Sequence, residues 1–210
     1  MHGNFVTGGR TEPEFPGGLI PDRAWNGTPE FALGITDSFE VGAYLPFALT
    51  RDGEFEPGGA KLRALLASPH AHDCRFFYGL NFELSHQPRP FEEKHWGSEV
   101  RPIIGWRRAP VEVILNPIVD LALGGPRRTI AFAPATRVAW LLSSEWAVGL
   151  EHYADFGPID RFVPRSQRLQ EIFLVADRSV AAFDVDFGVG RGLTSGSDDW
   201  TIKFILGWSL

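Results

Sequence analysis

Apolar and polar side chains alternate over most of this chain. In the segment SFEVGAYLPFALT, Phe39, Val41, Ala43, Leu45 and Phe47 occupy every second position. Successive side chains of a β-strand point to opposite faces of a sheet, so strict alternation predicts strands with one apolar face. The pattern therefore raises the question of whether this face packs against a protein core or against lipid.

The alternation recurs from one end of the chain to the other, and no segment has a convincing helical period. It is clearest at residues 76–85, 96–107, 130–142, 183–189 and 200–208, and weaker at 171–177, where Phe173 and Val175 interrupt it. A short segment at 61–67 and a poor one at 4–8 bring the count to about twelve, and bacterial outer-membrane barrels have even numbers of strands. Closure into a barrel removes the edges that such strands would otherwise expose. We predict an all-β fold, a transmembrane antiparallel up-and-down β-barrel of about 12 strands.

The connections between the predicted strands alternate between short and long. Residues 36–37, 108–110, 143–145 and 178–179 are short, whereas residues 9–25, 51–59, 87–95 and 157–166 are long. Outer-membrane barrels have short periplasmic turns and longer extracellular loops. With twelve strands, both termini lie on the side of the short turns. Four prolines, at positions 46, 102, 117 and 134, fall inside predicted strands, where each removes a hydrogen-bond donor and requires a bulge or locally open pairing.

Two features of the strands predict that the apolar face contacts lipid. The polar face is rich in small residues such as Gly34, Gly42, Gly79 and Gly149, which suit a crowded lumen better than a solvated exterior. Six tryptophans with apolar parity lie at strand ends, as in the aromatic girdles of membrane barrels. These girdle residues are Trp96, Trp106, Trp140, Trp146, Trp200 and Trp208. The alternative is a soluble, lipocalin-like binding barrel, whose apolar face would point inward.

Composition narrows the range of functions. A chain of 210 residues with 44% apolar residues and no low-complexity linker is most simply one domain, 1–210. Its net charge of −6 and the absence of a basic stripe argue against a nucleic-acid partner. The single cysteine, Cys74, excludes a disulfide framework, and no clustered ligands predict a metal or another cofactor. No apolar run reaches the ~18–20 residues of a transmembrane helix.

The polar face of the strands predicts a charged lumen. Parity and strand order place Arg101 near Glu83 and Asn116, Arg137 near Glu151, and Lys203 near Asp184 or Asp186. Two interpretations stay open: a structural lattice of ion pairs that fills a narrow barrel, or a lining that selects solutes along a narrow path. The residues predicted to line the lumen are Glu83, Glu99, Arg101, Asn116, Asp120, Arg137, Glu151, Glu171, Asp184, Asp186 and Lys203.

No catalytic constellation emerges from the pattern. A lipid-facing hydrolase needs a serine nucleophile beside a histidine base. Ser85 and His86 are sequence neighbours and point to opposite faces, and His152 has no serine among its predicted same-face neighbours. The sequence therefore predicts that the protein is not an enzyme.

The beginning of the chain departs from the pattern of an exported barrel. Residues 1–8 precede the first long loop, whereas a spanning strand needs ~9–11 residues. We therefore expect the first strand to be truncated at its N-terminal end. The chain also encodes no signal peptide, which needs a basic start, an apolar stretch and a cleavage site.

Several segments resemble a known family. The stretches GRTEPEFPGGLI, NGTPEFALGITDSFEVGAYLPFAL, NPIVDLAL and FGVGRGLTSGSDDWTIKFILGWSL are similar to outer-membrane β-barrel proteins of the MetA-pathway-of-phenol-degradation family. The resemblance covers essentially the whole chain and implies a bacterial outer-membrane transporter for small organic, often aromatic or hydrophobic, compounds. It brings no catalytic residues.

Pattern and resemblance together predict a monomeric, passive outer-membrane channel, a porin for small organic solutes, with the lipid bilayer and the solute as its partners. The competing hypotheses are a plugged barrel whose long loops have a binding or structural role, and the soluble binding barrel.

Overall fold

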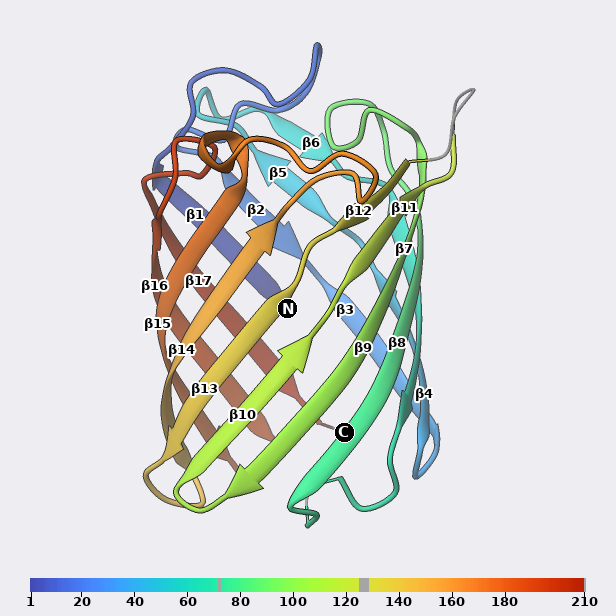
Figure 1. The fold of residues 1–210 in the computed structure, drawn as a ribbon, viewed down its shortest axis with the longest axis vertical. Coiled ribbons are helices and arrows are strands. Elements are labelled where there is room, and N and C mark those ends of the chain that lie inside the picture. Colours follow the sequence, from blue (N-terminus) through green and yellow to red (C-terminus); the bar gives the residue numbers. More distant parts are fainter. Residues whose placement is uncertain (72, 125–128, 210) are drawn as a thin grey trace.

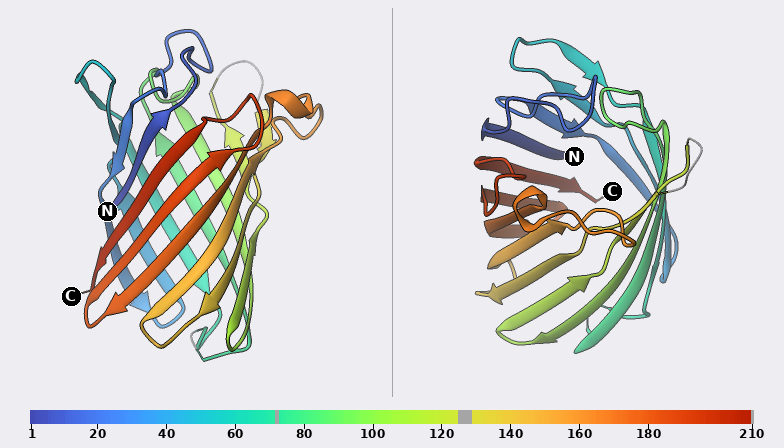
Figure 2. Two further views of the ribbon diagram at one scale, coloured as in Figure 1. Left: turned by 90° about the vertical axis from the view of Figure 1, so that its left-hand side faces the viewer. Right: turned by 45° about the horizontal axis from the view of Figure 1, so that its top comes forward.

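The computed structural model describes residues 1–71, 73–124 and 129–209. These residues form one antiparallel sheet of 17 strand segments, which curls into a barrel-shaped wall (Figures 1 and 2). The helical structure described in these ranges is a single 3₁₀ turn, η1 (Arg165–Gln167). No helix in the described residues has the length and hydrophobicity needed to cross a membrane.

The strand segments follow one another along the chain with few residues between them, and their bounds are these. They are β1 (His2–Gly8), β2 (Trp25–Thr28), β3 (Glu30–Thr36), β4 (Phe39–Tyr44), β5 (Phe47–Leu49), β6 (Phe55–Pro57), β7 (Ala60–Ala67), β8 (Phe76–His86), β9 (Trp96–Arg108), β10 (Val111–Asn116), β11 (Val119–Ala122), β12 (Thr129–Phe132), β13 (Ala135–Leu141), β14 (Trp146–Asp155), β15 (Leu169–Val180), β16 (Phe183–Gly192) and β17 (Trp200–Trp208).

Each strand pairs chiefly with its neighbours in the sequence, and the first also pairs with the last. β1 pairs with β2 through His2–Phe5 and with β17 through His2–Gly8. Hydrogen-bonded neighbours can therefore be followed from β1 around the wall to β17 and back to β1. β3 pairs with β4 along one edge. β1 does not extend along the other edge, because its pairing with the preceding strand β2 ends at Thr28. The described strands include no partner for the second edge of β3.

The count of 17 segments differs from the predicted twelve because five strands are interrupted. The interruptions lie at residues 29, 45–46, 58–59, 117–118 and 133–134. Four of them contain a proline, which has no N–H for the ladder, and the fifth is Gly58 with Gly59. Backbone bonds still join neighbouring strands beside the breaks: Leu45 N–H donates to Pro29 O at 3.0 Å and Gly58 N–H to Pro46 O at 2.7 Å. Side-chain parity continues across the four breaks that contain a proline, so alternation alone does not detect them. At Gly58–Gly59 the parity reverses, since exposed Phe55 precedes the break and exposed Leu62 follows it.

The connections alternate between short and long, with the long ones gathered at one end of the wall (Figure 1, top). Two predicted turns are shifted along the chain. β15 continues to Val180, so its turn to β16 is Ala181–Ala182 and not residues 178–179, and Ala181 has a φ of 53°. The turn between β3 and β4 is at residues 37–38, one residue later than predicted.

The distribution of side chains is the reverse of that in a soluble barrel. Large apolar residues are exposed, such as Phe31 at 66%, Leu174 at 65% and Trp208 at 67%. Charged residues are buried inside, with Glu151 at 6% and Lys203 at 7% exposed. A lipocalin-like barrel would bury the apolar face around a ligand, so this arrangement contradicts the soluble alternative and agrees with an apolar outer surface.

The two apolar residues that interrupt the alternation at 171–177 are buried inside the wall. Phe173 and Val175 lie on the inner face of β15 and are 4% and 1% exposed. Phe173 meets Tyr153 of β14 edge to face, with ring centroids 5.6 Å apart. They form an apolar patch beside the charged residues of the interior.

Candidate functional site

The inner face of the late strands carries a network of ion pairs, here called the lattice. It consists of Arg137 (β13), Glu151 (β14), Asp177 (β15), Asp186 (β16) and Lys203 (β17). Arg137 Nη1 lies 2.6 Å from Glu151 Oε1 and 3.7 Å from Asp186 Oδ2, and its Nη2 pairs with Asp177. Lys203 Nζ pairs with Glu151 and lies 3.4 Å from Asp186 Oδ1. Two cations thus pair with three carboxylates, which leaves one negative charge in excess.

The lattice is packed as well as paired. Tyr153 Oη donates to Glu151 Oε2 at 2.8 Å. Lys203 Nζ also lies 5.8 Å from the ring centroid of Tyr153 and 5.6 Å from that of Phe173. Buried charges are tolerated when neighbours neutralise and hydrogen-bond them, and Glu151 and Lys203 meet both conditions. The buried Oδ1 of Asp186 has no hydrogen-bond partner in the described residues. The lattice therefore fills one side of the interior.

Smaller ion pairs continue around the inner wall. Arg63 (β7) pairs with Glu40 (β4) and lies 3.1 Å from Glu30 (β3), which also bonds to His2 Nε2 at 2.7 Å. Arg107 Nε donates to Glu112 across the β9–β10 pair at 2.6 Å. These ion pairs link β7 with β3 and β4, and β9 with β10.

A cavity opens at the end with the long loops, and its volume is about 510 Å³. We call it the vestibule. Its wall comes from the upper ends of β8, β9, β11 and β12, and residues 14–15 and 91–94 of two loops cover it. Glu83 (β8), Glu99 (β9) and Asp120 (β11) line it, and the strand register sets Glu83 opposite Glu99 and Glu99 opposite Asp120. We call these three residues the carboxylate row.

The structure divides the predicted lumen residues between these two places. Arg137, Glu151, Asp186 and Lys203 meet in the lattice, and Arg101 Nε donates to Glu99 Oε1 at 2.8 Å beside the carboxylate row. Lys203 reaches Asp186 and not Asp184, which is exposed on β16 near the short-turn end, opposite Gly207. The predicted proximity of Lys203 to Asp184 is therefore corrected in favour of Asp186.

Two other predicted residues stand apart from both groups. Asn116 ends β10, and its buried Oδ1 has no hydrogen-bond partner in the described chain. Glu171 lies on β15 near Asp198 and Arg10 of the long loops.

Sequence reasoning omitted several residues of the interior. Asp177 completes the lattice, and Tyr153 and Phe173 pack against its lysine. Asp155, at the end of β14, lines the vestibule. Asp177 and Asp155 have the same parity as Glu151, so alternation alone could have assigned both to the interior. Phe173 has no such signal, because an apolar residue on the polar face reads as a flaw in the pattern.

The six predicted girdle tryptophans are all exposed, between 40% and 67%. Trp96 and Trp200 begin β9 and β17 at the end with long loops, and Trp106, Trp140, Trp146 and Trp208 lie at the opposite ends of their strands. They therefore form two groups, one near each rim of the wall.

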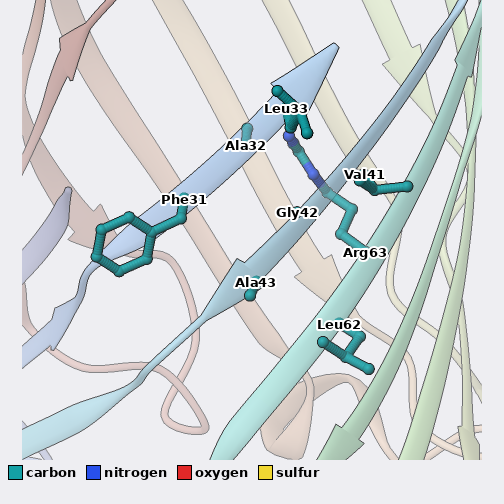
Figure 3. Close-up of a pocket in the computed structure, with 8 residues that line it drawn as sticks. All are labelled: Phe31, Ala32, Leu33, Val41, Gly42, Ala43, Leu62 and Arg63. Carbon is teal, nitrogen blue, oxygen red and sulfur yellow. The ribbon is translucent and has the colours of Figure 1, made fainter. Parts of the chain in front are cut away.

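The outer surface also has an apolar hollow across β3, β4 and β7, with a volume of about 460 Å³ (Figure 3). Phe31, Leu33, Val41 and Leu62 surround the small side chain of Ala43. Arg63 extends beneath β4 toward β3, where it meets its carboxylate partners. The hollow is a depression in the apolar surface, and Arg63 is the charged residue among those that line it.

The fold, compared with solved structures, matches outer-membrane barrels. The structure described as NanC porin has a TM-score of 0.64 and 9% identity, over 100% of this chain and 98% of that one. The fold is porin-like. Also similar are LpxR from Salmonella typhimurium, with a TM-score of 0.47 and 9% identity over 89% and 88% of the chains, and a mutant porin of Rh. blastica, with a TM-score of 0.31 and 10% identity over 100% and 98%.

Comparisons of the sequence with family models and with curated proteins give no match. The resemblance to the MetA-pathway-of-phenol-degradation family is therefore not confirmed, and the coarser porin-like fold is what the comparisons support.

One prediction from the sequence is wrong. We predicted that the protein is not an enzyme, yet LpxR, one of the solved barrels that this chain resembles, is an outer-membrane enzyme. The argument from Ser85, His86 and His152 concerned one arrangement of a serine and a histidine, and it did not exclude other chemistry.

Proposed function

We propose that the chain is a monomeric, twelve-stranded barrel of the bacterial outer membrane and a passive, low-conductance channel for small organic solutes. In this proposal the 17 segments act as twelve continuous strands, because each of the five interruptions lies between two segments of one strand. The observation that carries the proposal is a porin-like fold over the whole chain, apolar outside and charged inside, with a vestibule open at the end with long loops.

The interior also sets the expected size of the current. The lattice fills one side of the lumen, so the water-filled path is narrow, and low conductance follows. The same lattice favours a second candidate, a plugged barrel in which the loops have a binding role. A closed interior requires buried charges that are paired with each other, and Glu151 and Lys203 are such a pair.

Conductance in a planar lipid bilayer separates the two candidates. The channel proposal expects discrete, small current steps in potassium chloride after the purified protein is added. Heat-denatured protein at the same detergent concentration is the control and should give none. If the folded protein inserts into vesicles but gives no current, the barrel is plugged.

A further inference from the structure

The carboxylate row of the vestibule places three like charges side by side on adjacent strands. Residues directly opposite on neighbouring antiparallel strands have Cβ atoms about 4.5–5.5 Å apart, and like charges in that relation destabilise a sheet. Glu83, Glu99 and Asp120 occupy two such positions in succession. The next position beyond Asp120 is Ala131, so no cation follows in the row.

The two arginines nearest to the carboxylate row already form ion pairs, and one of these pairs is with a member of the row. Arg63 is opposite Glu83 in the register, but its guanidinium pairs with Glu30 and Glu40 on the other side. Arg101 pairs with Glu99. Over the whole vestibule, the described lining residues comprise seven acidic residues and two lysines, Lys61 and Lys94. Among the residues that the structure describes, acidic side chains therefore outnumber lysines in the vestibule lining.

A buried amide beside the row independently indicates a missing donor. Asn81 lies two residues before Glu83 on the same face of β8 and is 5% exposed. Its Nδ2 donates to Glu83 Oε1 at 3.0 Å, so the side chain reaches the row. Its Oδ1 is buried and has no hydrogen-bond partner in the described residues. Buried acceptors are rarely left unpaired, since each costs about 1–3 kcal/mol.

The remaining walls of the vestibule are apolar in part. Phe15 and Phe91 contribute rings from two different loops, and both are half-buried. The volume lies within the range of about 300–1,000 Å³ that is typical of small-molecule sites. A ligand that matches these walls carries N–H donors and a positive charge at one end and an apolar body at the other.

We propose that the vestibule binds small organic ammonium ions, with the ammonium group at the carboxylate row and an aromatic or aliphatic body between Phe15 and Phe91. An ammonium group supplies donors and positive charge to the row, and charge-assisted hydrogen bonds are the stronger kind. This proposal specifies the class of solute that the proposed channel carries, so it rests on the proposed function.

Calorimetric titration of the full chain in detergent tests the proposal without requiring an open channel. The probes are benzylammonium, benzyl alcohol and benzoate, which share one ring and differ in charge. We expect benzylammonium to bind at least about tenfold more tightly than benzyl alcohol, and benzoate not to bind. Equal binding of the three probes would overturn the proposal. Magnesium ions that displace benzylammonium at equal concentration would also overturn it, in favour of an inorganic cation site.

Variants locate the site. Asp120→Asn removes one charge from the row at constant size and should weaken benzylammonium binding about tenfold. The matched control is Asp160→Asn, an exposed carboxylate in the loop between β14 and η1, and it should bind as the parent does. Equal affinities for the two variants would contradict the assignment. Ammonium binding without conductance would refute the channel and keep this site, whereas conductance without ammonium binding would do the reverse.

Discussion

The lattice and the carboxylate row occupy the same inner wall but treat charge in opposite ways. In the lattice, each carboxylate has a cation within an ion-pair distance, and aromatic rings pack against the lysine. In the carboxylate row, three carboxylates adjoin and only Glu99 has a cationic partner among the described residues. The row faces the vestibule, whereas the lattice faces its own aromatic neighbours.

This difference separates charges that hold the wall together from charges that are available to a solute. A paired and buried charge gains nothing from an arriving ion, because its partner must first be displaced. An excess of one sign in an open cavity attracts counter-ions and lowers the barrier to their entry. The comparison therefore assigns a structural role to the late strands and a recognition role to β8, β9 and β11.

Removal of the lysine at the centre of the lattice should have the largest effect. Lys203→Met leaves Glu151 and Asp186 buried with Arg137 as their one remaining cation, and breaking such a pair costs about 3–5 kcal/mol. The control Lys61→Met, in the open vestibule, should cost about 1 kcal/mol or less. Urea unfolding in lipid vesicles, followed by tryptophan fluorescence, measures both.

The double variant Lys203→Met/Glu151→Gln sharpens this result. It removes one charge of each sign, so it should recover part of the stability that Lys203→Met loses. If Lys203→Met and Lys61→Met lose the same amount, the lattice is no more structural than the vestibule.

The two regions should also differ in how tightly they are packed. An alanine Cβ at Gly190 would collide with the ring of Phe173, and overpacking of this kind costs about 1–3 kcal/mol. At Gly97, beside the carboxylate row, the Cβ would meet Ser85 Oγ at 2.8 Å, and a hydroxyl on an open wall can turn away. Gly190→Ala should therefore unfold at clearly lower urea than Gly97→Ala, and the reverse order would mean that the vestibule is the rigid part.

The overall wall could be predicted from the sequence because membrane strands expose one physical signal, the alternation of side chains. Residues as distant as Phe31 and Leu206 obey it, and both are exposed. The break at Gly58–Gly59 does leave a signal, because the exposed face changes parity between Phe55 and Leu62. The interruption at Pro29 could not be predicted, since parity continues across it and it bonds to the adjacent break at Leu45. Segment number depends on those local bonds, and alternation carries no information about them.

The interior was predictable as a set of residues but not as two groups. Side-chain parity assigned Glu83, Glu99 and Asp120 to the interior, and it assigned the predicted members of the lattice to the same face. Their separation depends on register, which decides that Glu99 lies opposite two carboxylates while Glu151 lies opposite Arg137. A shift of two residues in one strand would keep every side chain on its face and still change these partners. Parity therefore identifies the face, and only the pairing of strands identifies the neighbours.

The smallest predicted changes in stability come from replacing one aspartate in each region with asparagine, and they have opposite signs. Asp120→Asn relieves repulsion from Glu99 and should stabilise the empty barrel by about 0.2–1 kcal/mol, the range for a cross-strand pair. Asp186→Asn removes a partner of Lys203 and should destabilise it. Urea unfolding at low and at high salt measures both. Because the row lies in an open cavity, salt should screen its repulsion and reduce the gain from Asp120→Asn. The loss from Asp186→Asn should persist, since buried pairs are screened much less. If Asp120→Asn destabilises the barrel at low salt, the row is held by partners of its own, and the distinction between the two regions fails.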